Sequence, residues 1–309
     1  VNFIRASHYP YTRYISQLCD ELGILLWEEI PVYWNINWSN AETKTIAKTM
    51  LTQMIHRDWN RASVIIWSIG NETPFSDARM DFMIDLKHTA DGLDSSRLIS
   101  AALLSGSVEQ FRSLTYFLAK EGLKHNFVND YEKAIFKQIV SQLQPLYSSM
   151  DTFRINIKDP LAEHLDVIAY NEYFGWYYTS FIVDQLGVEE STLRKLMFKL
   201  MPSIKIESQY KKPIHLSEFG AGAKRNFKAD GGIWSEEYQE DVYRHQLEMI
   251  QNNNQIQGLS PWILKDFRSM MRPLADVQDF YNRKGLVDEE GKKKKAFKVL
   301  QQFYQDNWE

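Results

Sequence analysis

The sequence has very little cysteine, no long apolar run and no strong excess of either charge. It holds one cysteine among 309 residues, Cys19, which excludes an internal disulfide and a metal site built from several cysteines. Cys19 lies on an apolar helical face, which predicts a small buried hydrophobe and not a nucleophile. No apolar run reaches the roughly 20 residues that a membrane helix needs. A formal net charge of −4 gives no electrostatic reason to expect a nucleic acid or a membrane as partner.

A recognisable secretory leader and an initiating Met are also missing. The chain opens at Val1 directly in an expected strand, so we expect it to be a piece of a longer protein. Its composition, 44% hydrophobic and 25% charged, is typical of a soluble globular protein. The compartment, cytoplasmic or periplasmic/extracytoplasmic, stays open.

Apolar, strand-like runs alternate with helical patterns along the chain. We expect seven strands, at 1–5, 24–28, 63–69, 97–103, 165–170, 213–217 and 256–263. Helices are expected between and after them, at about 11–22, 41–60, 77–92, 189–201, 235–253 and 292–305. This repetition predicts an α/β fold with a parallel sheet and right-handed crossovers.

A (β/α)8 TIM barrel fits this pattern, but such a barrel has eight strands. One strand–helix unit is therefore expected to be missing before Val1. An open doubly wound sheet is the alternative, and it is disfavoured because no glycine-rich phosphate loop follows the first strand. Residues 1–309 are thus expected to form one catalytic-type barrel domain.

Two further segments are open to more than one interpretation. Residues from about 104 to 160 predict a helical insertion, with helices at 107–122 and 129–148 and a polar connector. Such an insertion lies beside the site or at an oligomer contact, so a homo-oligomer stays open. The run Lys292–Lys295 predicts a solvated helix start more than a basic binding patch, because it is short and Ala296 follows.

Two of the expected strands end in a glutamate beside a glycine. The apolar run from Ser63 stops at Gly70 and is followed by Asn71 and Glu72, and the run from Pro213 ends at Glu218. The carboxyl ends of barrel strands carry the chemistry of this fold. Two carboxylates on one rim, in a chain with nine Trp and without a metal-ligand cluster, favour acid–base and nucleophilic work on an acetal.

A retaining glycosidase needs a proton donor and a nucleophile about 5–5.5 Å apart. Their pKa values have to be pushed apart, so that one carboxyl keeps its proton and the other stays ionised. Asn71 is expected to bond a sugar hydroxyl, and Tyr173 or Tyr177 is expected to donate to Glu218. No cofactor is implied.

Four segments in this order resemble the catalytic barrel of glycoside hydrolase family 2: Arg5–Pro10, Leu22–Leu25, Trp67–Glu72 and Ser217–Gly220. The resemblance covers nearly the whole chain except the 104–160 insertion. It implies that Glu72 is the acid/base and Glu218 the nucleophile, and that His8 and Trp262 belong to the substrate site. It also implies that the first barrel strand, a sugar-binding β-domain and an immunoglobulin-like domain lie upstream in the full-length protein.

Within that family the chain is most similar to bacterial β-glucuronidases. Asn171–Tyr177 resembles their Asn-Arg-Tyr-Tyr-Gly-Trp-Tyr segment, with Glu172 in place of the Arg. Asn282 and Lys284 resemble the Asn-x-Lys pair that holds the carboxylate of the sugar, and a lysine and an amide suit that anion. The Ser260–Phe267 segment departs from the pattern, so β-galactosidase and other β-glycosidase activities stay open. A non-catalytic sugar-binding barrel is the alternative from another class.

Overall fold

The structure is a computed structural model that describes residues 1–104 and 107–307. Residues 105–106 of the expected insertion and residues 308–309 of the expected domain lie outside the described residues. In the described part no helix is long and apolar enough to cross a membrane.

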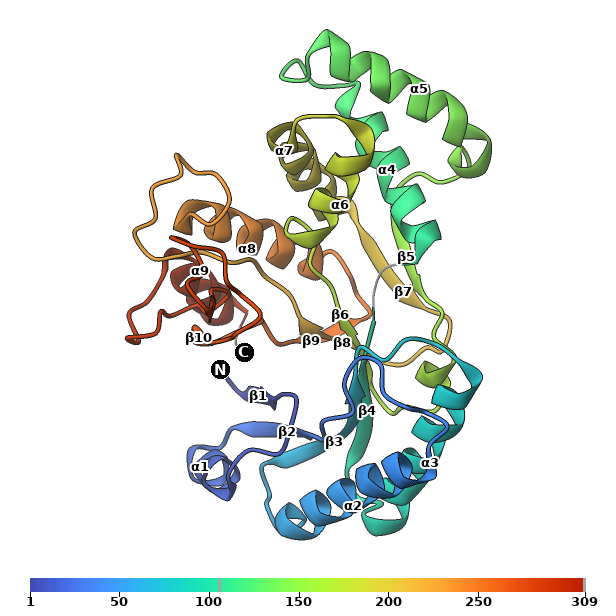
Figure 1. The fold of residues 1–309 in the computed structure, drawn as a ribbon, viewed down its shortest axis with the longest axis vertical. Helices are drawn as coiled ribbons and strands as arrows, with labels where there is room; N and C mark the ends of the chain where they lie inside the picture. Colours follow the sequence, from blue (N-terminus) through green and yellow to red (C-terminus); the bar gives the residue numbers. More distant parts are fainter. Residues whose placement is uncertain (105–106, 308–309) are drawn as a thin grey trace.

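The main sheet has seven parallel strands in the order in which the chain makes them. They are β1 (Phe3–Ala6), β2 (Leu25–Glu29), β3 (Val64–Asn71), β4 (Leu98–Leu103), β6 (Ile168–Asn171), β8 (Ile214–Glu218) and β9 (Ile256–Leu259). A doubly wound sheet reverses its strand order at one point, whereas a barrel does not. The sheet curls with its helices on the outside (Figure 1), which confirms the TIM-barrel expectation.

The curled sheet is not closed by backbone pairing among the described residues, because β1 and β9 are its two edge strands and are not paired with each other. Side chains nevertheless reach across this opening. Arg5 of β1 donates to the carbonyl oxygen of Ser217 on β8, and the rings of His8 and Trp262 stack with centroids 5.0 Å apart. The two ends of the sheet therefore meet at the rim.

Five helices pack around this sheet: α1 (Arg13–Leu22), α2 (Ala41–Asp58), α3 (Asp77–Leu93), α8 (Glu236–Gln251) and α9 (Lys295–Asp306). Three of them begin at a side-chain cap, since Asn40, Ser76 and Ser235 each accept a hydrogen bond from a backbone N–H of the first turn. Cys19 on α1 is buried, as predicted.

The insertion contains the two expected helices, α4 (Val108–Gly122) and α5 (Asp130–Tyr147), each opened by a capping box. Its connector also holds a short strand that was not predicted. This strand, β5 (Arg154–Ile157), pairs in parallel with β7 (Lys205–Ser208). Helices α6 (Tyr177–Leu186) and α7 (Glu190–Leu200) lie beside α4 (Figure 1), and α6 was not predicted either.

Short elements complete the fold. Two 3-10 turns, η1 (Pro160–Glu163) and η2 (Met201–Ser203), precede strands, and a two-stranded antiparallel ribbon of β10 (Phe267–Arg268) and β11 (Tyr281–Asn282) lies in the long loop after β9.

The expectation of a solvated lysine run before α9 is wrong for one residue. Lys294 is fully buried, and its ammonium lies 2.8 Å from Oδ1 of buried Asp266. Lys294 also donates to the carbonyl oxygens of Ala223 and Arg283. This lysine therefore ties the start of α9 to the loop that follows β9, while Lys292, Lys293 and Lys295 are exposed.

The floor beneath the rim is a small apolar layer inside the sheet. Trp27 of β2 and Ile66 of β3 pack there against Ala102 of β4 and Ala169 of β6. The alanines leave room for the indole of Trp27, which is fully buried. Glu29, Ser68 and Asn171 lie two positions further along β2, β3 and β6, and they point to the same inner side because side chains alternate along a strand.

Candidate active site

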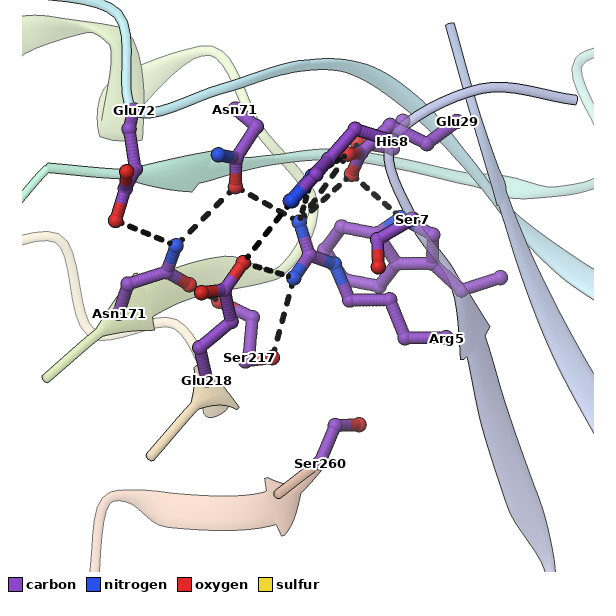
Figure 2. Close-up of polar contacts among 12 residues, drawn as sticks. Arg5, Ser7, His8, Glu29, Asn71, Glu72, Asn171, Ser217, Glu218 and Ser260 are labelled. Atoms are coloured by element: carbon purple, nitrogen blue, oxygen red, sulfur yellow. Dashed lines mark hydrogen bonds and ion pairs between the residues drawn. The ribbon is translucent and has the colours of Figure 1, made fainter. Parts of the chain in front are cut away.

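The two predicted carboxylates lie at neighbouring points of one rim. Glu72 directly follows β3, and Glu218 is the last residue of β8. Asn171, the last residue of β6, stands between those strands in the sheet. Its amide donates to Oε1 of Glu72 over 3.0 Å and accepts from the hydroxyl of Ser217 over 2.7 Å. Figure 2 shows both carboxylates beside this amide.

Glu218 is buried and held by two strong donors. Arg5 donates to its Oε1 over 2.8 Å, and the phenol of Tyr173 donates to its Oε2 over 2.7 Å. Burial, and then the negative charge of Glu218, raise the pKa of Tyr173 well above its ordinary value. Tyr173 therefore keeps its proton and acts as a donor. Each oxygen of Glu218 therefore accepts a hydrogen bond, one of them from a cation.

Glu72 has a different environment. Its backbone has a φ of 50°, and its second oxygen, Oε2, accepts the indole N–H of Trp34 over 2.9 Å. Burial, followed by the negative charge of Glu218, raises the pKa of Glu72, and the bonds from Asn171 and Trp34 oppose this. Glu72 therefore keeps its proton to a higher pH than an exposed glutamate, as a general acid requires.

Arg5 contacts several polar side chains of the site. Its guanidinium bonds Glu218, lies 3.0 Å from Oε2 of Glu29, and donates to Oδ1 of Asn71 over 2.8 Å. His8 completes the group, with its Nδ1 2.9 Å from Oε1 of Glu29. Although burial alone raises it, the pKa of Glu29 is lowered by the charge of Arg5 and the bond from His8. Glu29 thus stays ionised and balances the positive charge of Arg5. Figure 2 shows the contact between the two side chains.

Asn71 is placed to meet a ligand. Its Oδ1 is occupied by Arg5 and by the amide of Asn171, whereas its buried Nδ2 has no hydrogen-bond partner among the described residues. A buried donor without a partner is costly, and a sugar hydroxyl in the site would satisfy it.

A row of stacked rings lines one side of the rim. His8 stacks between Tyr33 and Trp262, with centroid distances of 4.9 Å and 5.0 Å, and Tyr33 stacks in turn on Trp34 at 4.4 Å. His8 and Trp262, both predicted for the substrate site, therefore lie together beside Glu218, to which Nε2 of His8 is 3.6 Å distant.

A cationic cavity, with Glu190 as the one acidic residue among its described lining residues, lies beside Tyr177, whose ring contacts that of Tyr173. Its volume is about 220 Å³, and its lining includes Tyr177, Arg272, Asn282 and Lys284. The ammonium of Lys284 lies 2.5 Å from the hydroxyl of Tyr177, and Arg272 donates to the same hydroxyl over 3.4 Å. Against the effect of burial, these two cations lower the pKa of Tyr177. Of the two tyrosines considered for Glu218, Tyr173 makes that contact and Tyr177 belongs to this cavity.

Burial lowers the pKa of Lys284, and the nearby charge of Arg272 adds to this, while Tyr177 opposes it. Asn282 is the last residue of β11 in the antiparallel ribbon. Its Oδ1 accepts a hydrogen bond from the backbone N–H of Lys284 over 3.2 Å. An anion entering the cavity would therefore meet a fixed lysine with an arginine close by.

Glu172 lies between Asn171 and Tyr173 in the sequence, but its side chain points away from the site. It is fully buried, and its Oε2 accepts from the backbone N–H of Phe174 over 2.8 Å. Burial raises its pKa to about 8, opposed only by that bond. Its side chain contacts Gln246 of α8 and not the rim.

The structure brings all ten predicted site residues to this rim or to the cationic cavity. It also places there residues that were not predicted as site residues, among them Arg5, Glu29, Tyr33, Trp34 and Arg272. A sequence signal existed for Glu29, which directly follows the expected strand 24–28, just as Glu218 directly follows the expected strand 213–217. Trp34 and Arg272 lie in loops, and no local pattern marks them.

A curled parallel sheet whose carboxyl rim carries two differently held carboxylates defines a TIM-barrel protein with a candidate acid–base site. The chain belongs to glycoside hydrolase family 2, since residues 1–307 match the family described as "Glycosyl hydrolases family 2, TIM barrel domain".

Proteins of similar sequence include named β-glycosidases. A putative β-glucuronidase of Formosa agariphila is 28% identical over 98% of this chain and 32% of its own length, and the β-glucuronidase of Sus scrofa is 25% identical over 98% and 38%. A β-galactosidase of Thermoanaerobacterium thermosulfurigenes is 41% identical over 29% of this chain and 13% of its own.

Among solved structures, a family 2 β-galacturonidase from Eisenbergiella tayi bound to galacturonate has a TM-score of 0.68 at 23% identity, over 99% of this chain and 45% of that one. The chain thus spans less than half the length of these relatives.

Proposed function

We propose that this chain is the catalytic barrel of a retaining exo-β-glycosidase that hydrolyses terminal β-glucuronides. The proposal rests on the different surroundings of two neighbouring carboxylates, Glu72 and Glu218. Glu218 receives an arginine and a phenol, whereas Glu72 is buried against the charge of Glu218. The carboxylate that accepts two donors suits a nucleophile, and the one whose pKa is raised suits a general acid.

The proposed reaction has two steps. In the first, a carboxylate oxygen of Glu218 attacks the anomeric carbon, while the proton of Glu72 passes to the glycosidic oxygen and the leaving alcohol departs. In the second, ionised Glu72 takes a proton from water, whose oxygen attacks the anomeric carbon and releases Glu218. The free amide N–H of Asn71 is available to a sugar hydroxyl beside the reacting carbon. No cofactor takes part in these steps.

The cationic cavity supports a uronic acid as the sugar. Lys284, Asn282 and Arg272 line this cavity next to Tyr177 and offer donors to an anion. A neutral galactoside would leave the buried lysine with Tyr177 as its bonded neighbour. Charged pairing of this kind is worth enough to set a strong preference for the carboxylate.

A β-galactosidase is the second candidate, favoured by the relative at 41% identity and by the departure of Ser260–Phe267 from the glucuronidase pattern. In that case Lys284 is a bystander. The candidate from another class is a barrel that binds sugar without cleaving it. The relatives' greater length supports the further proposal that residues 1–309 form a single catalytic domain, completed by upstream β-domains; the oligomeric state stays open.

The test uses three substrates with one chromogenic leaving group: a β-glucuronide, a β-galacturonide and a β-galactoside. We expect the protein to prefer the uronides, Glu218→Gln to abolish turnover, and Lys284→Ala to lower uronide cleavage by at least roughly 100-fold relative to galactoside cleavage. Lys293→Ala, at an exposed lysine outside the cavity, is the matched control. Preference for the galactoside would favour the second candidate, and sugar binding without turnover would favour the binding barrel.

A further inference from the structure

We propose that Trp34 forms the platform of the leaving-group subsite and positions Glu72. The subsite would take a leaving group with a flat apolar face, which is either an aromatic ring or the face of a second sugar. The inference rests on the proposed function, because it assigns the group on the far side of the bond that Glu72 protonates.

The loop that carries Trp34 is attached to the end of β3. The backbone N–H of Trp34 donates to the carbonyl of Asn71 over 3.1 Å, and the N–H of Asn71 donates to the carbonyl of Val32 over 2.8 Å. These bonds fix Trp34 next to the residue that precedes Glu72. The indole N–H then reaches Oε2 of Glu72 over 2.9 Å.

Trp34 is held in a costly conformation. Its φ of 55° lies in the left-handed region, which bulky residues rarely adopt. Such backbone is typically kept where function requires it. The ring is also ordered by stacking on Tyr33, with centroids 4.4 Å apart and planes inclined at 24°.

The indole remains open to solvent in spite of these contacts. Trp34 is 45% exposed, although Tyr33 covers part of it and its N–H is bonded. An ordered, half-exposed tryptophan beside a catalytic acid offers a rigid apolar surface to a ligand.

The position of this surface identifies the ligand group. The sugar ring has to lie against Glu218, and the cationic cavity is on the side of Tyr177, which contacts Tyr173. Glu72 donates its proton to the glycosidic oxygen, so the group attached to that oxygen lies beyond Glu72. Trp34 contacts the oxygen of Glu72 that Asn171 does not hold. The exposed indole is therefore placed for the leaving group.

The stacking part is tested with methyl and benzyl β-glycosides of the preferred sugar, whose leaving alcohols have similar pKa values, and with a disaccharide that ends in the same sugar. We expect the protein to favour the benzyl glycoside by about 3- to 10-fold in kcat/KM. Trp34→Ala should remove this preference, and Trp34→Phe should retain most of it. Preference for the disaccharide alone would assign the platform to a sugar face.

The positioning part is tested by the pH dependence of kcat/KM on the methyl glycoside. Trp34→Phe keeps a ring and removes the N–H that stabilises ionised Glu72, so the alkaline limb should move up by roughly half to one pH unit. Trp59→Ala and Trp59→Phe, at another exposed tryptophan away from the rim, should change neither readout.

The platform role and the positioning role of Trp34 are each overturned by a different result. An unchanged benzyl-to-methyl ratio in folded Trp34→Ala overturns the platform, and an unmoved alkaline limb in Trp34→Phe overturns the positioning role. If the unsubstituted protein cleaves no β-glycoside, the proposed function itself is wrong, and the subsite falls with it.

Discussion

Tyr173 and Glu218 are joined by a hydrogen bond of 2.7 Å in which the phenol donates to Oε2. Arg5 donates to the other oxygen, Oε1, so the two bonds together fix the orientation of the Glu218 carboxylate. In the proposed reaction, negative charge returns to Glu218 as the glycosyl–enzyme bond breaks in the second step, and the phenol would stabilise that charge.

We therefore expect Tyr173→Phe to lower kcat by roughly 100-fold, as the loss of one donor to a reacting oxygen does. Steady-state kinetics with the preferred glycoside measure this. Tyr177→Phe is the matched control, since Tyr177 contacts Lys284 instead, and its effect should fall on KM for uronides. A Tyr173→Phe enzyme with the original kcat would rule out this role.

Glu172 gives a prediction on stability against pH. Its pKa of about 8 in the folded protein lies above the ordinary value of a glutamate, so the folded state binds more protons than the unfolded state between those values. The free energy of unfolding is therefore expected to fall as the pH rises through this window. Glu172→Gln removes the cost of ionisation, since an amide stays neutral.

We expect Glu172→Gln to match the original protein near pH 5 and to exceed its Tm by a few degrees, about 2–6 °C, at pH 8. Thermal unfolding at both pH values, monitored by circular dichroism, provides the comparison. Glu163→Gln, at an exposed glutamate, is the control. A Tm gain that is the same at both pH values would show that ionisation of Glu172 is not the cause.

Lys294 and Asp266 form a buried ion pair, and removal of one partner leaves the other charge buried. We expect Lys294→Met to lower the free energy of unfolding by about 3–5 kcal/mol. Adding Asp266→Asn should recover part of this loss. Urea unfolding measures both, with exposed Lys293→Met as reference, and equal stability of Lys294→Met and Lys293→Met would contradict the prediction.

The edges of the sheet give a prediction on local opening. Strands β1 and β9 each have one neighbour in the sheet, whereas β3 has two. We expect backbone amides of β1 and β9 in the isolated chain to exchange hydrogen faster than those of β3. In a longer form of the protein that supplies a strand between them, the protection should become similar. Equal exchange rates in the isolated chain would mean that the edges are covered in another way.

The main sheet could be predicted because its strands are nearly continuous apolar runs, such as Val64–Ile69, which indicate burial on both faces. The pair β5 and β7 could not, because Arg154–Ile157 and Lys205–Ser208 are four-residue segments of mixed polarity that are ordered by pairing with each other. Local pattern contains no information about such a partner.

The same limit applies to the site. Glu72 and Glu218 end strands and could be found from that position alone. Lys294 was misjudged because its partner, Asp266, lies in a separate loop, and only the folded chain brings the two together. Trp34 and Arg272 gained their contacts to Glu72 and Tyr177 in the same way.

The bond between Arg5 and Glu218 joins positions 213 residues apart. During synthesis, at about 5–20 residues per second, Arg5 waits roughly 10 to 40 s before its partner leaves the ribosome. Until then Arg5 and Glu29 can pair, but the nucleophile of the proposed site does not yet exist. The emerging chain is therefore expected to acquire activity in a single late event, and recovery of turnover during refolding would report on the meeting of the two ends of the sheet.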